Sequence, residues 1–376
     1  MAVQEPKVAI VHDWLVGGGA ERVVLELHRM YPDAPIYTSY ATDEWRKRLD
    51  GKVVTGFLQK WPFGRLRKFL PLLRIWWFTH LDLSEYDVVI SSSGNGEAKS
   101  VKTRPHTTHI CYCHSPTHFY WRNYELYLRQ PGFGRFDPLA RLGLRLLIGP
   151  LRRWDLRASK RPDYFIANST HIQQDIKKYY NRDATVIFPP VDTARFKPLP
   201  SKTRHGFVIA SRQVPQKKFD LAIEACNRLK LPLLVLGKGP EHERLAAMGG
   251  PTVTFKEHVT DAEMETYLAT AEGFLWPCFD DFGIVAVEAI ASGTPVIAFK
   301  AGGSLDYVVP GKTGLFFDQQ TAESLMNVLQ DFPNHAFDHA AIAQTAQNFS
   351  PEMFQQRMSA FISEAISEHT SVVTKT

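Results

Sequence analysis

Two successive series of short apolar segments, each followed by a turn and an amphipathic stretch, constrain the fold of this 376-residue chain most strongly. Strands that alternate with helices in this way form parallel sheets with helices on both faces. Two such series predict an α/β protein built from two doubly wound, Rossmann-like domains. The first series comprises residues 8–11, 87–91, 108–112, 164–168 and 185–188, and the second comprises residues 207–210, 233–236, 253–255, 273–276 and 295–298.

Prolines mark the boundary between the two predicted domains. Four of them interrupt the chain between residues 189 and 200, where a linker is favoured over a strand or a helix. We therefore expect an N-terminal domain over residues 1–193 and a C-terminal domain over residues 194–349. Open parallel sheets bind ligands at the carboxyl ends of their strands, which in a two-domain protein directs the ligand to an interdomain cleft.

The composition excludes a disordered or fibrous chain, because 44% of the residues are hydrophobic and 22% are charged. The cysteines Cys111, Cys113, Cys226 and Cys278 are too scattered for a disulfide framework, and no second Cys or His pair completes a zinc site. The amino terminus lacks the pattern of a signal peptide, and no apolar run reaches the roughly 18 residues that a spanning helix needs. We expect a cytoplasmic protein.

Positive charge is concentrated in the first 200 residues, which hold 30 Lys and Arg against 19 Asp and Glu. Residues 60–78 and 133–161 interleave these cations with aromatic and aliphatic side chains, as a segment in contact with an anionic lipid surface does. A core-packed helix with a charged outer face is the alternative, and for residues 133–161 it stays equally open. Nucleic acid is not an expected partner, because no DNA- or RNA-binding motif accompanies the charge. We expect peripheral association with the inner face of the cell membrane.

The segment that begins at Asp280 carries the strongest chemical signal. A helix is predicted to begin near Gly283 and to end near Gly293. Helix amino termini bind phosphates through free N–H groups, and Gly283 lets a ligand approach the backbone closely. A nucleotide lying along this helix would place its ribose near Glu288. Asp280, in the preceding loop, would then face the sugar beyond the phosphates.

This segment resembles the acid-x7-acid motif of the retaining family 4 glycosyltransferases, which have the GT-B fold. The resemblance implies that Glu288 binds the donor ribose and that Phe282, Gly283 and Ile284 belong to the donor-binding turn. The family usually has Glu at the first acidic position. Here it is Asp280, which is one methylene shorter and changes the reach to the donor sugar.

Two further segments of the predicted C-terminal domain and tail carry the resemblance. Residues 211–217 look like the Arg-x4-Lys segment of the family, which implies that Arg212 and Lys217 clamp the donor diphosphate. Two cations near one strand end can neutralise a leaving diphosphate as its charge grows. Residues 350–376 look like the last helix of GT-B enzymes, which crosses back onto the first domain.

The N-terminal half carries the resemblance at two places. Residues 17–22 resemble the glycine loop that closes on the donor phosphates, which implies a role for Gly18 and Gly19. His114 is similar to the histidine that the family places near the transferred sugar. His118, four residues further on, is the competing candidate.

The spacing after Asp280, together with residues 188–192, most resembles the branch of the family that uses GDP-mannose. The resemblance implies metal-independent transfer of mannose with retention, in α linkage, onto a lipid-linked or membrane-associated glycan. No side chain is obviously placed as a covalent nucleophile, so same-face attack assisted by the leaving phosphate is implied. The catalytic residues implied are His114, Arg212, Lys217 and Asp280.

Two alternatives stay open at this point. One is a different GT-B chemistry, either a sugar-nucleotide epimerase or a transferase that uses a UDP-sugar. No residue selects guanine, and residues 253–259 form a rim for the base by family likeness alone. The other is a non-enzymatic membrane assembly partner with a decayed site, which only the substitution at Asp280 favours.

Overall fold

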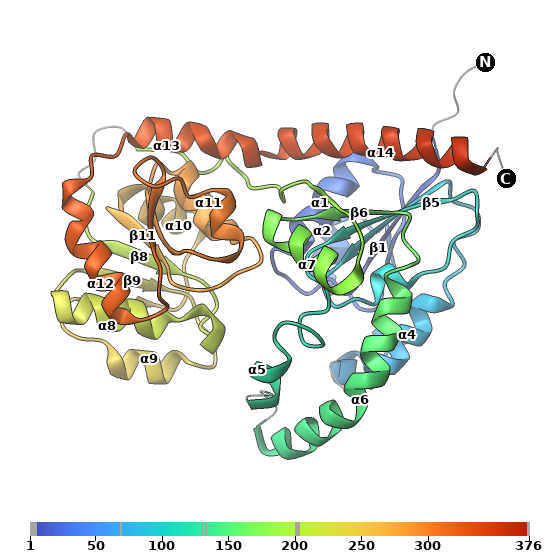
Figure 1. The fold of residues 1–376 in the computed structure, drawn as a ribbon, viewed down its shortest axis with the longest axis horizontal. Coiled ribbons are helices and arrows are strands. Elements are labelled where there is room, and N and C mark those ends of the chain that lie inside the picture. Colours follow the sequence, from blue (N-terminus) through green and yellow to red (C-terminus); the bar gives the residue numbers. More distant parts are fainter. Residues whose placement is uncertain (1–5, 68–69, 130, 132–133, 200–203, 374–376) are drawn as a thin grey trace. The chain divides into compact units, whose positions relative to one another are not determined.

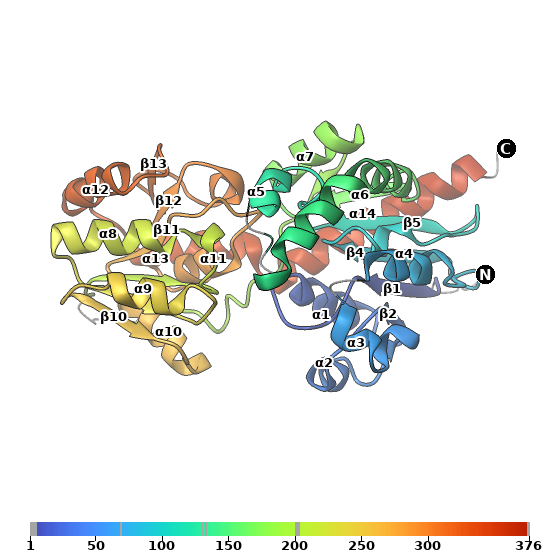
Figure 2. The same cartoon turned by 90° about the horizontal axis from the view of Figure 1, so that it is seen from below.

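The computed structural model describes residues 6–67, 70–129, 131, 134–199 and 204–373 (Figure 1). The chain divides into two compact units. The N-terminal unit comprises residues 1–189 and 355–376, and the C-terminal unit comprises residues 190–354. The boundaries expected from the sequence, after residues 193 and 349, lie close to these. Each unit has a parallel sheet flanked by helices, so the predicted α/β class with two doubly wound, Rossmann-like units is confirmed (Figures 1 and 2).

The sheet of the N-terminal unit has the strand order β3-β2-β1-β4-β5-β6-β7 among the described residues, and every pairing is parallel. The residues of β1, β4 and β5 are all buried, as expected for strands covered on both faces. The strands are β1 (Val8–His12), β2 (Ile36–Thr38), β3 (Val53–Val54), β4 (Val88–Ser93), β5 (Thr108–Cys113), β6 (Tyr164–Ala167) and β7 (Thr185–Val186).

The helices of this unit alternate with its strands, and the last of them comes from the end of the chain. They are α1 (Ala20–Met30), α2 (Asp43–Arg48), α3 (Phe63–Leu66), α4 (Pro71–Thr79), α5 (Tyr124–Arg129), α6 (Asp137–Ala158), α7 (Thr170–Tyr180) and α14 (Pro351–Val373). From Gln355 onward α14 belongs to this unit. The Gln355 amide donates to Glu26 Oε2 at 2.9 Å, and His369 Nε2 lies 2.8 Å from the Pro105 carbonyl oxygen.

The C-terminal unit has the strand order β10-β9-β8-β11-β12-β13 within the part of the chain that the structure describes. Its strands are β8 (Phe207–Ala210), β9 (Leu233–Leu236), β10 (Val253–Lys256), β11 (Gly273–Trp276), β12 (Val296–Phe299) and β13 (Gly314–Phe317). Its helices are α8 (Phe219–Leu229), α9 (His242–Met248), α10 (Asp261–Thr270), α11 (Ile284–Ala291), α12 (Ala322–Asp331) and α13 (His339–Thr345). Strands β2, β3 and β13 were not expected from the sequence.

The strand order reverses once in each sheet. In the N-terminal unit β1 lies beside β4, and in the C-terminal unit β8 lies beside β11. The crossover loops leave such a pair of strands in opposite directions, so their carboxyl ends flank a crevice where ligands of doubly wound sheets bind. A functional site is therefore expected among the residues that follow these four strands.

The buried His109 is expected to make the stability of the N-terminal unit depend on pH. His109 on β5 is fully buried, with Nε2 2.9 Å from Ser91 Oγ. Burial, with a smaller effect from the charge of Arg161, lowers the pKa of His109 to about 3. The unfolded chain has the ordinary value of about 6.5, so between these values the unfolded state binds more protons and folding weakens as the pH falls.

We expect this loss to approach about 1.4 kcal/mol per pH unit below pH 6.5. A His109→Gln variant cannot titrate at this position, so its stability deficit relative to the wild type should shrink between pH 7 and pH 5. Urea unfolding of both proteins across this range measures the difference. A deficit that is constant with pH would show that His109 does not control this dependence.

Candidate active site

The crevice between β8 and β11 brings Lys217 and Asp280 together. Lys217 lies in the loop after β8 and Asp280 in the loop after β11, and Lys217 Nζ donates to Asp280 Oδ2 at 2.7 Å. The ammonium also lies 4.8 Å from the centre of the Trp276 ring. Burial alone would lower the pKa of Lys217, but the Asp280 carboxylate holds this pKa above its ordinary value. The amine is therefore a stable cation at the sheet edge.

A second glycine-containing turn, at Gly303, packs against the loop from Asp280 to Gly283. The amide of Gly303 donates to the Asp280 carbonyl oxygen at 2.9 Å, and a Cβ at residue 303 would lie 2.4 Å from Phe282 Cα. Gly283 has φ 99° and precedes α11, where a Cβ would lie 2.6 Å from the Tyr307 hydroxyl. Glycine is therefore needed at residue 303 for the close approach of two backbones and at residue 283 for the positive φ and the contact with Tyr307.

The amino terminus of α11 offers amides to an anion. The first hydrogen bond of the helix runs from the Ala286 amide to the Gly283 carbonyl oxygen at 3.0 Å. The amides of Ile284 and Val285 precede this bond, and such groups bind phosphate at helix starts. The ammonium of Lys217 adds a full positive charge at the same edge of the sheet. This arrangement suits a phosphate or diphosphate.

Two other residues of the predicted donor site, Phe282 and Glu288, are buried. The Phe282 side chain is 4% exposed and packs against the Tyr307 and Phe349 rings, with centroids 5.8 and 5.7 Å away. Any contact of Phe282 with a donor would therefore be made by its backbone. Glu288 is 3% exposed on α11, and its binding of a ribose stays a prediction.

The ion pair between Lys217 and Asp280 does not include Arg212. Its side chain is exposed after β8, and the structure gives it no hydrogen bond or ion pair with the described residues. The neighbouring Gln213, by contrast, is fully buried. A diphosphate clamp formed by Arg212 and Lys217 therefore stays a prediction.

The sequence did not indicate a role for Gln213, which connects the loop after β8 with the loop after β9 and with α9. Gln213 Nε2 donates to the Gly237 carbonyl oxygen at 2.6 Å, and its Oε1 lies 2.8 Å from His242 Nδ1. His242 Nε2 in turn lies 3.0 Å from Glu257, within the predicted base rim at residues 253–259. A Cβ at Gly239 would lie 2.2 Å from the Gln213 carbonyl oxygen, so the glycines after β9 were the available signal.

The crevice between β1 and β4 holds a chain of three side chains that ends at His114. His12 Nδ1 lies 3.0 Å from the Ser92 carbonyl oxygen and 3.1 Å from Ser92 Oγ. Ser92 Oγ lies 2.8 Å from His114 Nε2. A carbonyl oxygen can only accept, so His12 Nδ1 carries a proton, and the Ser92 hydroxyl is then able to donate to His114 Nε2.

Burial, with a smaller effect from His12, lowers the pKa of His114 to about 3, so this histidine is expected to be neutral at pH 7. If the Ser92 hydroxyl donates to Nε2, the His114 proton is on Nδ1. We expect this form. His118, the competing candidate, lies 3.3 Å from the Tyr127 hydroxyl. The structure thus places His114 at the end of this chain of side chains, and the choice between the two histidines stays a prediction.

The glycine loop after β1 is exposed at Gly18 and Gly19. The Glu21 carboxylate at the start of α1 accepts hydrogen bonds from the amides of Val16 and Gly17 at 3.2 and 2.9 Å. Glu21 therefore holds the beginning of the loop, and contact of Gly18 and Gly19 with donor phosphates stays a prediction.

Replacing Ser92 by alanine removes the hydroxyl between the two histidines. We expect kcat/KM for the transfer reaction that the sequence predicts to fall about tenfold, the equivalent of one hydrogen bond, with nucleotide affinity unchanged. Histidine 1H–15N NMR should show the Nδ1–H form of His114 in the wild type and a mixture in the variant. Ser93→Ala is the matched control, because Ser93 Oγ has no hydrogen bond among the described residues. An Nε2–H form in the wild type would contradict this arrangement.

The predicted membrane segment at residues 60–78 has some side chains buried in the core of the N-terminal unit and others exposed at its surface. Arg74 pairs with Glu97 at 2.7 Å, with side chains 5% and 1% exposed, and Trp77 and Phe78 are buried. Trp61 is 83% exposed. Lys68 and Phe69 of this segment, and Phe133 of the other, lie outside the described residues.

Neither metal ligands nor membrane-spanning helices are found among the residues that the structure describes. No group of three or more His, Cys, Asp or Glu side chains is arranged to hold a metal ion. No helix in this part of the chain is long and apolar enough to cross a bilayer. Metal independence stays a prediction.

Comparison with known families decides how the chain is classified. Residues 17–195 match the family described as Glycosyltransferase Family 4, and residues 190–349 match Glycosyl transferases group 1. The two matches together cover residues 17–349. The chain belongs to glycosyltransferase family 4. The resemblance noted in the sequence is thereby confirmed, and the family consists of glycosyltransferases, the class of enzyme that was expected.

Relatives of this family 4 chain include two mannosyltransferases. One is the GDP-mannose-dependent alpha-(1-6)-phosphatidylinositol monomannoside mannosyltransferase of Mycolicibacterium smegmatis. The two sequences are 29% identical over an alignment that covers 45% of this chain and 52% of the relative. The chain is also 25% identical to the alpha-1,3/1,6-mannosyltransferase ALG2 of Dictyostelium discoideum, over 83% of this chain and 86% of that one. The chain spans about half the length of the mycobacterial relatives that it matches.

Solved structures confirm the GT-B fold. HepE of Anabaena, solved with UDP and glucose, superposes with a TM-score of 0.67 at 19% identity and covers 96% of this chain and 100% of its own. The sucrose-phosphate synthase of Thermosynechococcus elongatus gives a TM-score of 0.70 at 17% identity, with 96% and 99% covered. At these sequence identities the structural similarity supports the fold and nothing further.

Proposed function

We propose that this family 4 glycosyltransferase transfers mannose from GDP-mannose to a lipid-linked acceptor, with retention of the α configuration. The observation that carries the proposal is the cation Lys217 paired with Asp280, in the same crevice as the free amides of α11. That site suits the diphosphate of a nucleotide-sugar. Mannose is supported by the named activities of both the Mycolicibacterium and the Dictyostelium relatives. GDP-mannose as donor and a phosphatidylinositol-linked acceptor are supported by the name of the Mycolicibacterium relative.

In the proposed reaction the donor diphosphate lies against the amides of Ile284 and Val285 and against Lys217. As the bond between the sugar C1 and the phosphate oxygen breaks, negative charge grows on the departing GDP. A fixed ammonium and fixed amides stabilise that charge most in the transition state, which accelerates the step. The acceptor hydroxyl attacks from the same face, and its proton passes to the leaving phosphate oxygen. The new glycosidic bond and GDP are the products.

Asp280 and His114 have separate proposed roles. Once the diphosphate draws part of the Lys217 charge, Asp280 can accept a hydrogen bond from a hydroxyl of the donor sugar. Neutral His114, with Nδ1–H free of Ser92, can donate to a sugar hydroxyl. Neither role requires a covalent intermediate on the protein.

Transfer of radiolabelled mannose tests the proposal. The purified chain would be incubated with GDP-mannose or a UDP-sugar and with phosphatidylinositol or a polyprenyl-diphosphate-linked sugar in detergent micelles. We expect label in the lipid phase only with GDP-mannose, and an α anomer by NMR. Label from a UDP-sugar alone would assign the other donor. GDP-mannose that is neither transferred nor hydrolysed would favour the non-enzymatic alternative.

A further inference from the structure

The first half of α6 presents apolar side chains to solvent. Leu139, Leu142 and Leu146 are three and four residues apart, which places them on one face of the helix. Their exposed fractions are 68%, 54% and 69%. Single exposed leucines are ordinary, whereas a row of them on one face marks a contact surface. We call these three residues the α6 stripe.

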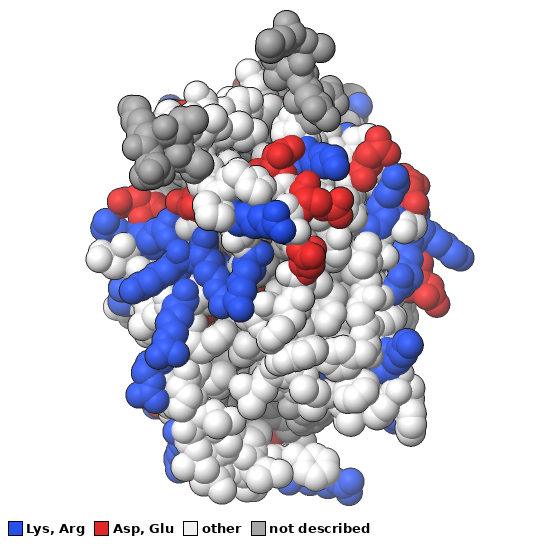
Figure 3. Space-filling view, turned by 90° about the vertical axis from the view of Figure 1, so that its right-hand side faces the viewer, with Lys and Arg blue, Asp and Glu red and all other residues white. Residues whose placement is uncertain are grey.

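Positive charge predominates beside the α6 stripe. Asp137, at the start of α6, lies 4.0 Å from Arg141, and no other acidic residue occurs on the helix before Asp155. Residues 138–154 contain four arginines and no acidic residue, and Arg145 and Arg153 are exposed. On the face drawn in Figure 3, acidic side chains gather in the upper half and the lower half is almost free of them. Apolar side chains among cations suit an anionic lipid surface. A second copy of the chain would bring arginines against arginines, which disfavours a symmetric dimer.

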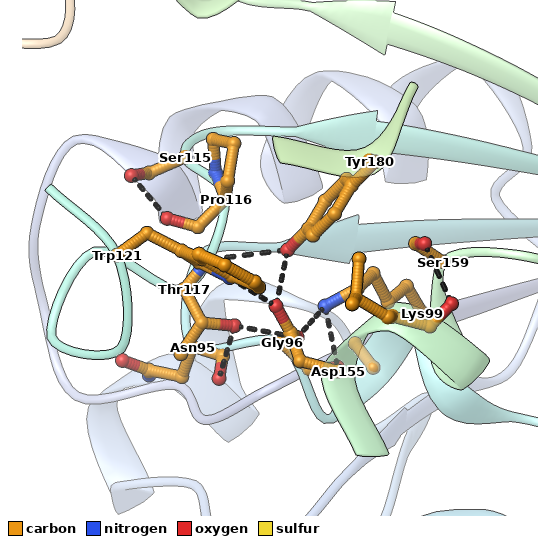
Figure 4. Close-up of polar contacts among 12 residues, drawn as sticks. Asn95, Gly96, Lys99, Ser115, Pro116, Thr117, Trp121, Asp155, Ser159 and Tyr180 are labelled. Atoms are coloured by element: carbon orange, nitrogen blue, oxygen red, sulfur yellow. Dashed lines mark hydrogen bonds and ion pairs between the residues drawn. The ribbon is translucent and has the colours of Figure 1, made fainter. Parts of the chain in front are cut away.

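The second half of α6 is fixed in the fold by Asp155, which is fully buried. Its Oδ1 accepts from Lys99 Nζ at 2.6 Å and from Thr117 Oγ1 at 2.9 Å (Figure 4). Its Oδ2 accepts from Trp121 Nε1 at 2.7 Å and from the Tyr180 hydroxyl at 2.8 Å. Four donors therefore hold the carboxylate, and the helix cannot rotate there without breaking them.

The same contacts join α6 to the loop that follows His114. Thr117 and Trp121 belong to this loop, and Arg152 Nε on α6 donates to the Tyr120 carbonyl oxygen at 2.7 Å. All of these residues lie within the N-terminal unit. The direction of α6 is thus coupled to the position of the loop beside the candidate sugar-binding histidine.

We propose that the α6 stripe docks on an anionic lipid bilayer and that Asp155 transmits this docking to the loop after His114. The inference rests on the proposed function, because a lipid-linked acceptor would lie in the same bilayer. The leucines enter the boundary between headgroups and acyl chains, and the arginines beside them meet lipid phosphates. The acceptor-side loop is thereby held at a fixed distance from the membrane surface.

Vesicle binding without any sugar tests the docking surface. The wild type would be sedimented with vesicles of phosphatidylcholine, with or without phosphatidylglycerol, beside a Leu139→Gln/Leu142→Gln/Leu146→Gln variant. Glutamine keeps the helix propensity and removes the apolar surface. We expect the wild type to bind the anionic vesicles and the variant to partition at least about tenfold less.

A matched control removes three exposed apolar side chains outside α6 and outside residues 60–78. Val54, Leu199 and Val309 are 41%, 36% and 47% exposed. The Val54→Gln/Leu199→Gln/Val309→Gln variant should bind vesicles like the wild type. In detergent micelles both variants should keep wild-type transfer, so a loss of docking is distinguishable from a failure of the proposed function.

Three results would overturn the inference. One is equal vesicle binding by the wild type and the α6 variant, and another is an equally large loss in the control variant. The third is a wild-type dimer by size-exclusion chromatography with light scattering that the α6 variant dissociates, without vesicle binding. That outcome would assign the α6 stripe to a second copy of the chain.

Discussion

A Lys217→Ala variant is expected to lose about 10²- to 10³-fold in kcat for the proposed mannose transfer, because one preorganised donor to the departing diphosphate is removed. The effect should fall on kcat, since the ammonium gains most as negative charge develops. The fold should remain intact, because the side chains of Lys217 and Asp280 are 21% and 31% exposed and Asp280 is left near solvent. Steady-state kinetics and thermal melting measure the two effects.

Arg228→Ala is the control for this prediction. Arg228 lies near the far end of α8 in the same unit, in exposed ion pairs with Glu224 and Glu323. Its loss removes one positive charge without touching the crevice, so kcat should stay at the wild-type value. If Lys217→Ala keeps more than half of the activity, Lys217 is not the residue that stabilises the leaving group.

An Asp155→Ala variant is expected to destabilise the N-terminal unit by about 3 to 5 kcal/mol, since it leaves the ammonium of Lys99 buried without its counter-ion. The Lys99 side chain is 1% exposed, and Asp155 keeps the pKa of Lys99 above its ordinary value although burial alone would lower it. Trp121 and Tyr180 lose their acceptor as well. Thermal melting should show a decrease of about 10 °C.

Two further variants separate the causes. Asp183→Ala removes a carboxylate that pairs with Lys177 at 2.8 Å but is 93% exposed, so melting should hardly change. A Lys99→Met/Asp155→Leu variant removes both charges and should recover part of the loss. Full recovery is not expected, because Thr117, Trp121 and Tyr180 still lack their acceptor. A wild-type melting temperature for Asp155→Ala would show that this buried cluster contributes little.

Local patterns predicted most of the sheet architecture. Each of the ten expected segments contains a strand. The last segment of the first series, residues 185–188, forms a strand only over Thr185–Val186. Strands β2 and β3 have three and two residues, too few to show a period, and they pair at one edge of the sheet. The amphipathic pattern of residues 60–78 could not show which side is buried, because the partner of Arg74 is Glu97, 23 residues away.

The candidate site was predictable where a motif is local. Asp280, Gly283 and the helix start follow one another in the chain, and glycine spacing showed the close approach. The contacts that the sequence did not reveal join distant segments. His12 and Ser92 are 80 residues apart, and Lys99 and Asp155 are 56 apart. No local propensity encodes such pairs, since each residue alone is an ordinary strand or helix residue.

We propose that a nucleoside diphosphate binds at the amino terminus of α11 beside Lys217, and thermal melting with GDP, UDP and ADP measures this binding. At about one hundred times its Kd a ligand that binds only the folded state adds about 2.7 kcal/mol, which should raise the melting temperature by about 5 to 10 °C. We expect this rise with GDP, and its loss in Lys217→Ala. No rise with any of the three nucleotides, or an equal rise with GDP in the wild type and in Lys217→Ala, would contradict the claim.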